Sequence, residues 1–180
     1  MDYTHPVPRG LYRFHHARTA HFIPFTCYHR YPHLADPAVR DLFVQALERM
    51  RSLYRVRIYG FVVMPEHLHL LISEPERGTV ATAIQSLKIA SAKPGKRLLA
   101  AQAAQLPFWQ KRYYDRNQSE HEEFIEKLKY IHRNPVKRKL VERPEQWKWS
   151  SSRHYASGED CGVEIESWRN RSHSFAPPAS

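Results

Sequence analysis

Strand-like and helix-like stretches follow one another along this chain in an order that specifies a topology. Residues 21–31 are rich in aromatic and β-branched side chains, which is typical of a strand, and Pro24 among them predicts an edge position or a bulge. Asp36 and Pro37 match a helix N-cap followed by proline at the first helical position. Apolar residues then recur every three to four positions, which predicts a helix to about Leu53.

The middle of the chain predicts a β-hairpin followed by a helix. Residues 57–64 and 67–73 both have strand composition and are separated by two residues, so we expect them to pair as a hairpin. Residues 79–92 carry a helical apolar stripe. We expect the Pro-Gly pair at 94–95 to interrupt this helix, which then resumes over 96–105.

The remaining pattern adds a fourth strand, over 108–114, and another helix. Ser119 and Glu122 resemble a capping box that begins this helix, and Pro135 is expected to end it, because a following proline disfavours helical dihedrals. The complete order is β-α-β-β-α-β followed by a helix. This is the split β-α-β, ferredoxin-like order, so we expect an α+β fold: an antiparallel sheet with helices on one face.

The length and composition favour one globular domain. We expect an N-terminal lead-in over residues 1–18, the domain over 19–157, and a flexible C-terminal tail over 158–180, where the chain becomes polar. Two distant cysteines argue against a disulfide framework or a cysteine-based zinc module. The N-terminus has no signal-like apolar region and no run approaches 18 apolar residues, so we expect a cytoplasmic protein without a membrane span.

The charge distribution favours nucleic acid as the partner. Lys and Arg number 28 against 18 Asp and Glu, a net charge of +10. Residues 77–114 contain no acid at all, and residues 124–140 contain only Glu126, with aromatic residues interleaved. Cations neutralise phosphates and aromatic rings stack on bases, which suits single strands in particular. The alternative is an ordinary basic surface over an aromatic core. The cations that we expect to contact nucleic acid are Lys88, Lys93, Lys96, Arg97, Lys111, Arg112, Lys127, Arg133, Lys137, Arg138 and Lys139.

The first candidate site is the histidine pair on the third predicted strand. Side chains two positions apart on a strand project from the same face, so His67 and His69 should point one way and Leu68 the other. Two neighbouring imidazoles on a rigid strand form a two-point chelate for a divalent metal. The alternative is a pair of ordinary surface or core histidines, because a chain with 12 histidines contains such a pair readily by chance.

The second candidate site is a tyrosine near the end of the last predicted helix. Tyr130 and Asn134 are four residues apart, so they should lie on the same side of the helix. A tyrosine hydroxyl can attack a phosphodiester and retain the phosphate covalently. A divalent cation would polarise that phosphate, and an amide oxygen is a suitable additional ligand for it. The alternative is that Tyr130 packs at the helix end and Asn134 serves as its cap.

Three strings of the sequence together resemble a known family. They are MPEHLHLL, FWQKRYYDRN and YIHRNPVKRKLVERPEQWKWSSSRHY, and the resemblance is to the REP-associated branch of the single-tyrosine HUH transposases. It covers roughly residues 11–156. The HUH pattern alone is a weak signal, whereas its combination with Y-x-x-x-N-P-V and P-E-x-W-x-W-S-S in this order is specific. The family fold is ferredoxin-like, in agreement with the predicted order of elements.

The resemblance assigns roles to the two candidate sites. It implies that His67 and His69 are the HUH metal ligands, that Tyr130 is the nucleophile, and that Asn134 is the third protein ligand. Related insertion-sequence transposases usually carry glutamine at that last position, and asparagine is one methylene shorter. The implied metal is Mg²⁺ or Mn²⁺.

The resemblance also implies a reaction and a substrate. The tyrosine forms a 5′-phosphotyrosine link to single-stranded DNA and frees a 3′-hydroxyl, and a second 3′-hydroxyl reverses the step elsewhere. The family's substrates are short palindromes that fold as hairpins, and the two basic runs would follow the hairpin backbone. Insertion-sequence relatives work as homodimers, whereas a monomer is expected of the REP-associated branch.

Other functions stay open at this point. One is a domesticated protein that binds DNA hairpins without transposing, against which the intact ligand and nucleophile pattern argues. Another is a replication initiator or relaxase of the HUH class, although those chains are usually longer. A ferredoxin-like RNA-binding module would have no need of the Tyr130–Asn134 pair. Tyr113 and Tyr114 are the rival nucleophiles, but they lie on a predicted strand without a helical partner ligand.

Overall fold

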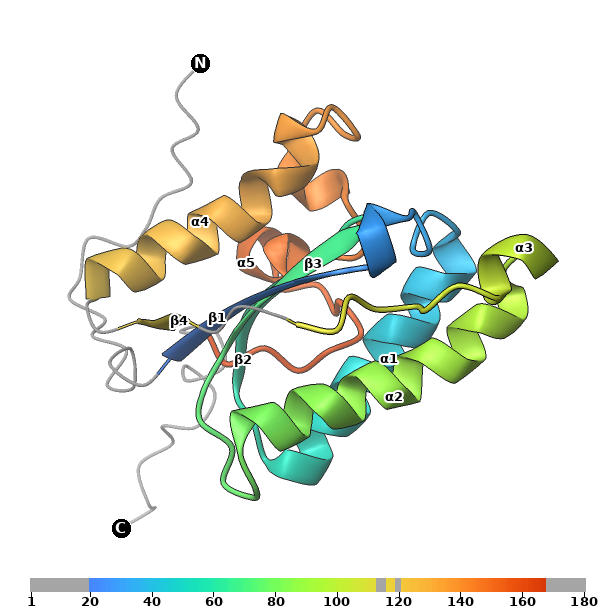
Figure 1. Cartoon of the computed structure of the whole chain (residues 1–180). Helices are drawn as coiled ribbons and strands as arrows, with labels where there is room; N and C mark the ends of the chain where they lie inside the picture. Colours follow the sequence, from blue (N-terminus) through green and yellow to red (C-terminus); the bar gives the residue numbers. More distant parts are fainter. Residues whose placement is uncertain (1–19, 113–115, 119–120, 168–180) are drawn as a thin grey trace, which may run out of the picture.

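The computed structural model describes residues 20–112, 116–118 and 121–167, and its elements follow the predicted order (Figure 1). The strands are β1 (Ala20–Thr26), β2 (Ile58–Val63), β3 (His67–Ile72) and β4 (Arg116–Gln118). The helices are α1 (Pro37–Tyr54), α2 (Val80–Leu98), α3 (Ala101–Ala104), α4 (His121–Lys137) and α5 (Ser152–Ser157), with 3₁₀ turns η2 (Tyr28–Arg30) and η3 (Pro144–Gln146). The predicted α+β, ferredoxin-like fold class is confirmed. None of the helices in these ranges is long and apolar enough to cross a membrane.

The strands form one antiparallel sheet in the order β2-β3-β1-β4. β4 pairs with β1 only from Ala20 to Phe22, so Pro24 lies beyond the described part of β4 and pairs with His69 of β3 on its other side. β1 is an interior strand of this sheet, and its register with β3 runs through Pro24 without a shift. The edge position or bulge predicted for Pro24 is therefore not confirmed.

Helices cover both faces of the sheet (Figure 1). α1 and α2 pack on one face, as predicted, over a core that includes Phe25, Phe43, Leu47, Leu68, Leu70 and Leu87. α4 lies on the opposite face, where Phe124, Leu128 and Ile131 pack against Tyr59, Val62, Leu71 and Trp147. The prediction of helices on one face therefore holds for α1 and α2 only. Every residue of β2 and β3 is buried, so both faces of these strands need a cover.

Two prolines that were expected to break helices lie inside them. α2 continues through Pro94 to Leu98, and α4 continues through Pro135 to Lys137. A proline removes one backbone hydrogen bond, and tertiary packing of the apolar face outweighs that loss here. The close packing is visible at Gly95, where an added Cβ would lie 2.8 Å from the Phe108 ring. The predicted interruption at 94–95 and the predicted helix end at Pro135 are therefore wrong.

The first and fourth strands differ from their predicted bounds. β1 ends at Thr26 and not at residue 31, because His29 and Arg30 both have positive φ values, of 45° and 58°, which no strand accommodates. The fourth strand is 116–118 and not 108–114. Trp109 makes only an isolated bridge with Cys27. Residues 113–115 and Ser119, with its predicted capping box, lie outside the described residues.

The segment after α5 packs on the domain, so the tail predicted from residue 158 begins too early. Cys161, Val163 and Ile165 are buried in the core of the α1–α2 face, and Ile165 forms a parallel bridge with Ile58. Their period of two is a short strand-like signal within a polar stretch. Residues 168–180 and the predicted lead-in lie outside the described residues.

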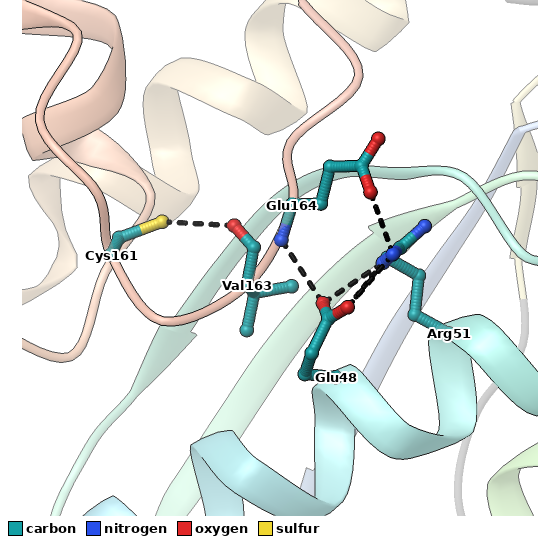
Figure 2. Close-up of polar contacts among 5 residues, drawn as sticks. All are labelled: Glu48, Arg51, Cys161, Val163 and Glu164. Atoms are coloured by element: carbon teal, nitrogen blue, oxygen red, sulfur yellow. Dashed lines mark hydrogen bonds and ion pairs between the residues drawn. The ribbon is translucent and has the colours of Figure 1, made fainter.

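Polar contacts hold the same segment against α1 (Figure 2). Arg51 forms ion pairs with Glu48 at 2.7 Å and with Glu164 at 2.6 Å. The backbone amide of Glu164 donates to Glu48 Oε2 at 3.0 Å. One arginine and one carboxylate of α1 thus fix the chain near its last described residues.

Two tryptophans hold the segment between α4 and α5 against the domain. The Trp147 indole donates to the carbonyl oxygen of Val63 at 3.0 Å, and the Trp149 indole donates to Asp41 at 2.8 Å. The guanidinium of Arg40 lies 3.8 Å from the centre of the Trp149 ring. These contacts connect the chain after α4 to β2 and α1.

Candidate active site

A pocket of about 330 Å³ opens beside the β1–β3 pair and α4, and it contains all four residues of the two candidate sites. Its lining joins the end of β1, the start of β3 and the last turns of α4. The lining residues are Pro24, Phe25, Thr26, Arg30, His67, Leu68, His69, Tyr130, Asn134, Lys137 and Arg138.

The two histidines lie side by side at the bottom of this pocket. Their ring centres are 5.0 Å apart, and the side chains are 7% and 6% exposed. Leu68 belongs to the core on the other face, as the strand alternation predicted. The His69 ring stacks on Phe22 at 5.4 Å, which fixes its orientation. The expected shared face of His67 and His69 is confirmed.

Both imidazoles are in the form that binds metals. Burial, together with the neighbouring basic groups, lowers the pKa of His69 to about 3. Burial also lowers the pKa of His67, although Glu66 beside it acts in the opposite direction. At neutral pH both rings are therefore neutral, and a neutral imidazole offers a lone pair to a metal.

The donor set of the pocket fits a divalent metal. Both ring nitrogens of His69 are buried and have no hydrogen-bond partner, which is costly unless another group satisfies one of them. Asn134, 5% exposed, adds an amide to the same lining. Across the described ranges, no three His, Cys, Asp or Glu side chains come together as a metal site, so a third protein ligand here would be the Asn134 amide. Two imidazole nitrogens and one amide oxygen form a mixed donor set that suits a divalent metal ion.

Tyr130 lies on α4 above the histidines. Its ring centre is 5.1 Å from that of His69, in an edge contact, and 6.2 Å from that of Phe22. The side chain is 40% exposed, so it faces both the pocket and solvent. Asn134 follows one helical turn later and lines the same pocket, as the four-residue spacing predicted. The rival nucleophiles Tyr113 and Tyr114 lie outside the described residues.

Glu66 and Arg30 belong to the site and were missed at the level of sequence. Glu66 Oε1 accepts hydrogen bonds from Arg138 at 2.7 Å and from Arg30 at 3.2 Å, and lies 3.1 Å from His67 Nδ1. Burial alone would raise the pKa of the Glu66 carboxyl, but the positive charges beside it, Arg138 among them, hold it below its usual value. A carboxylate directly before a histidine ligand was the available signal for Glu66. No local signal identifies Arg30.

The cations of α2 do not line the pocket. Lys88 is buried, and its ammonium donates to the carbonyl oxygen of Gln110 at 3.0 Å. Burial also lowers the pKa of Lys88, so this side chain serves the interior and its expected DNA contact is wrong. The other three, which we name the α2 cations, lie on the helix that covers the opposite face of the sheet: Lys93, Lys96 and Arg97. The α2 cations therefore lie apart from the pocket and from the cations of α4, and their expected contacts with DNA stay predictions.

The cations of α4 are on the pocket side. Lys137 and Arg138 line the pocket, and the Lys127 ammonium lies 5.2 Å from the centre of the Phe22 ring. Arg133 and Lys139 are exposed. Lys111 and Arg112 are exposed in the chain that follows Trp109. Their contacts with DNA stay predictions.

Comparisons with known proteins find similarity in sequence and in fold. A family model described as IS200-like transposase matches residues 15–134. A solved structure of a REP-associated tyrosine transposase bound to a REP hairpin superposes with a TM-score of 0.63 at 19% identity, covering 83% of this chain and 87% of that one. A putative transposase from Deinococcus radiodurans superposes with a TM-score of 0.48 at 21% identity, covering 62% of this chain and 87% of that one. No curated protein matches the chain significantly.

Proposed function

The chain belongs to the IS200-like transposase family, and from that premise we propose that it is a single-tyrosine endonuclease and strand transferase acting on single-stranded DNA hairpins. Membership alone makes it a transposase-type DNA-binding protein. One observation carries the finer proposal: Tyr130, His67, His69 and Asn134 line a single pocket although they come from two distant segments of the chain.

The proposed reaction is a transesterification at Tyr130. The phenol oxygen attacks the scissile phosphorus and loses its proton to solvent, while the bond from phosphorus to the 3′-oxygen breaks and that oxygen takes up a proton. The product is a 5′-phosphotyrosine and a free 3′-hydroxyl, so the energy of the phosphodiester is kept for rejoining. Mg²⁺ or Mn²⁺, held by His67, His69 and Asn134, would polarise the phosphate. The edge contacts of the Tyr130 ring with His69 and Phe22 support its position as nucleophile.

Hairpin DNA and a monomeric enzyme are parts of the same proposal. The superposed REP-associated transposase is bound to a REP hairpin, and the cations at this pocket suit a phosphate backbone. α4 packs on the sheet of its own chain with Tyr130 beside His69, which is the arrangement that a monomeric enzyme needs. A homodimer that exchanges α4 is the alternative. Light scattering of the purified protein distinguishes the two, because the homodimer has twice the mass.

The test is a cleavage assay on palindromes taken from the DNA that flanks the gene. Each oligonucleotide is labelled at its 3′ end, so a covalent complex carries the label into a denaturing protein gel. We expect wild-type protein with Mn²⁺ or Mg²⁺ to give this complex, and Tyr130→Phe and His69→Ala to give none. A wild-type protein that binds the hairpin but never cleaves it would favour the domesticated, DNA-binding function instead.

A further inference from the structure

Glu66 joins three parts of the pocket through a single carboxylate oxygen. Arg30 comes from the turn after β1, Arg138 from the chain after α4, and His67 begins β3. All three have a nitrogen within 3.2 Å of Glu66 Oε1. Glu66 itself is 7% exposed. A buried carboxylate in this position fixes the relative placement of groups that the chain brings from distant segments.

The backbone that carries Arg30 is held in a conformation that side chains rarely adopt. His29 and Arg30 are consecutive residues with φ values of 45° and 58°. Such strain persists where the surrounding structure enforces it, and it is concentrated at ligand-binding sites. Here the Arg30 amide donates to the carbonyl oxygen of Cys27 at 3.0 Å, and the His29 amide donates to Gln110 at 3.3 Å. The turn therefore fixes the point from which the Arg30 side chain reaches the pocket.

Both arginines keep donors available after binding Glu66. Their side chains are 59% and 49% exposed and both line the pocket. A guanidinium has five N–H donors in a planar fork that matches the oxygens of a phosphate. One carboxylate balances one of the two positive charges, so the pair retains a net positive charge facing the pocket. This arrangement suits an anion that enters beside Tyr130.

The contact of Glu66 with His67 determines which ring nitrogen of His67 keeps a lone pair for a metal. With the carboxylate 3.1 Å from Nδ1, the proton of the neutral ring belongs on Nδ1, where it is donated to Glu66. The lone pair then remains on Nε2. Carboxylates that accept from the far nitrogen of a ligating histidine fix its ring and tautomer. Glu66 therefore acts on both the anion-binding and the metal-binding half of the pocket.

We propose that Arg30 and Arg138 form a clamp for a backbone phosphate of single-stranded DNA, and that Glu66 is a positioning residue that aligns this clamp with His67. The proposal rests on the proposed function and extends it to two residues, Glu66 and Arg30, to which the family resemblance assigns no role. It predicts opposite consequences for the two kinds of substitution, because the arginines contact DNA and Glu66 does not.

The test measures binding in a Tyr130→Phe background, so that no DNA is cut. The DNA probe is a short fluorescein-labelled oligothymidylate without metal, followed by anisotropy, and the metal probe is Mn²⁺ alone, followed by calorimetry. We expect Arg30→Ala and Arg138→Ala each to weaken oligothymidylate binding about tenfold. Each should also flatten the log–log salt dependence by about 0.7, and neither should weaken Mn²⁺ binding.

Glu66→Gln should show the reverse pattern. It keeps the size of the side chain and an oxygen for the arginines, but it removes the charge that orients His67. We expect Mn²⁺ affinity to fall about 10–100-fold, the usual effect of losing such a partner. Affinity for oligothymidylate should stay equal or increase, because a negative charge leaves the pocket. A loss of stability alone would not separate the two affinities in this way.

Arg49→Ala is the matched control, because Arg49 is an exposed cation on α1, on the opposite face of the sheet. Arg30→Ala and Arg138→Ala variants that bind DNA as Arg49→Ala does would overturn the clamp. Unchanged Mn²⁺ affinity in Glu66→Gln would overturn the positioning role. A wild-type protein that binds no Mn²⁺ would overturn both the metal assignment and the positioning role of Glu66. The DNA titrations would still show whether Arg30 and Arg138 bind a backbone phosphate. Failure of Tyr130 as nucleophile would leave all of these binding results standing.

Discussion

Gly60 determines how closely α4 approaches the sheet, and replacing it by alanine should disturb both stability and catalysis. A Cβ at this position would lie 2.5 Å from Leu128 Cδ1 of α4 and 3.4 Å from Ser151 Oγ. The backbone of Gly60 is not in the left-handed region, so only space opposes alanine. The register between β2 and β3 shifts between Ile58 and Gly60, which marks a bulge at this point.

The magnitude follows from two opposing terms. Overpacking of this kind costs about 1–3 kcal/mol, whereas replacing glycine by alanine stabilises by about 0.4–1 kcal/mol through the unfolded state. We therefore expect Gly60→Ala to lower the free energy of unfolding by about 1–2 kcal/mol. For a chain of this size, each kcal/mol lowers the melting temperature by about 2–4 °C. Tyr130 is two residues from Leu128, and a displacement of about 1 Å costs roughly 100-fold in rate, so cleavage should fall by 10-fold or more.

Urea unfolding and single-turnover cleavage measure the two effects. The matched background is Leu128→Ala, which removes the atom that the new Cβ would meet. In that background Gly60→Ala should cost less than about 0.5 kcal/mol, so the two substitutions should be coupled by about 1–2 kcal/mol. Additive free energies, or a Gly60→Ala protein with wild-type stability and rate, would refute the idea that this glycine seats α4.

Three further predictions test the placement of charge, thiols and the C-terminal segment. Replacing residues 137–139 together by alanine should flatten the log–log salt dependence of DNA binding by about two, while replacing the α2 cations should leave it unchanged; equal effects would return α2 to the DNA-binding surface. Burial raises the pKa of Cys27 to about 12 and that of Cys161 to about 11, so both thiols stay protonated at pH 8. Iodoacetamide should then label them only in denaturant, and rapid labelling of the folded protein would contradict their burial. Trp149→Phe removes the hydrogen bond to Asp41 and should cost about 1–2 kcal/mol in urea unfolding; no change would mean that this contact adds nothing.

The order of elements could be predicted because it depends on local patterns. The two strand-like runs of β2 and β3 are joined by a two-residue link, and α1 begins at a recognisable N-cap. The apolar residues of α4 recur with the helical period. The face on which α4 packs could not be predicted in the same way. The residues of β3 alternate between two faces that are both buried, so the pattern does not say which helix covers which face.

The same distinction applies to the site. His67 with His69, and Tyr130 with Asn134, are pairs within one strand or one helix, so spacing alone brings each pair together. Arg30 reaches the pocket only through the fold and a strained turn, which no local spacing reveals. Lys88 was predicted to contact DNA because of its charge, but its ammonium donates a hydrogen bond to the backbone carbonyl of Gln110, 22 residues further along the chain.

The identity of the nucleophile is decided by mapping the covalent adduct. Wild-type protein is incubated with a hairpin oligonucleotide and Mn²⁺, digested with nuclease and trypsin, and analysed by tandem mass spectrometry. Trypsin cleaves after Lys129 and Arg133, so Tyr130 lies in the four-residue peptide YIHR, whereas Tyr113 and Tyr114 share the peptide YYDR. The proposed mechanism predicts a nucleotide phosphate on YIHR and its loss in Tyr130→Phe. An adduct on YYDR, or cleavage with no adduct on any tyrosine, would contradict it.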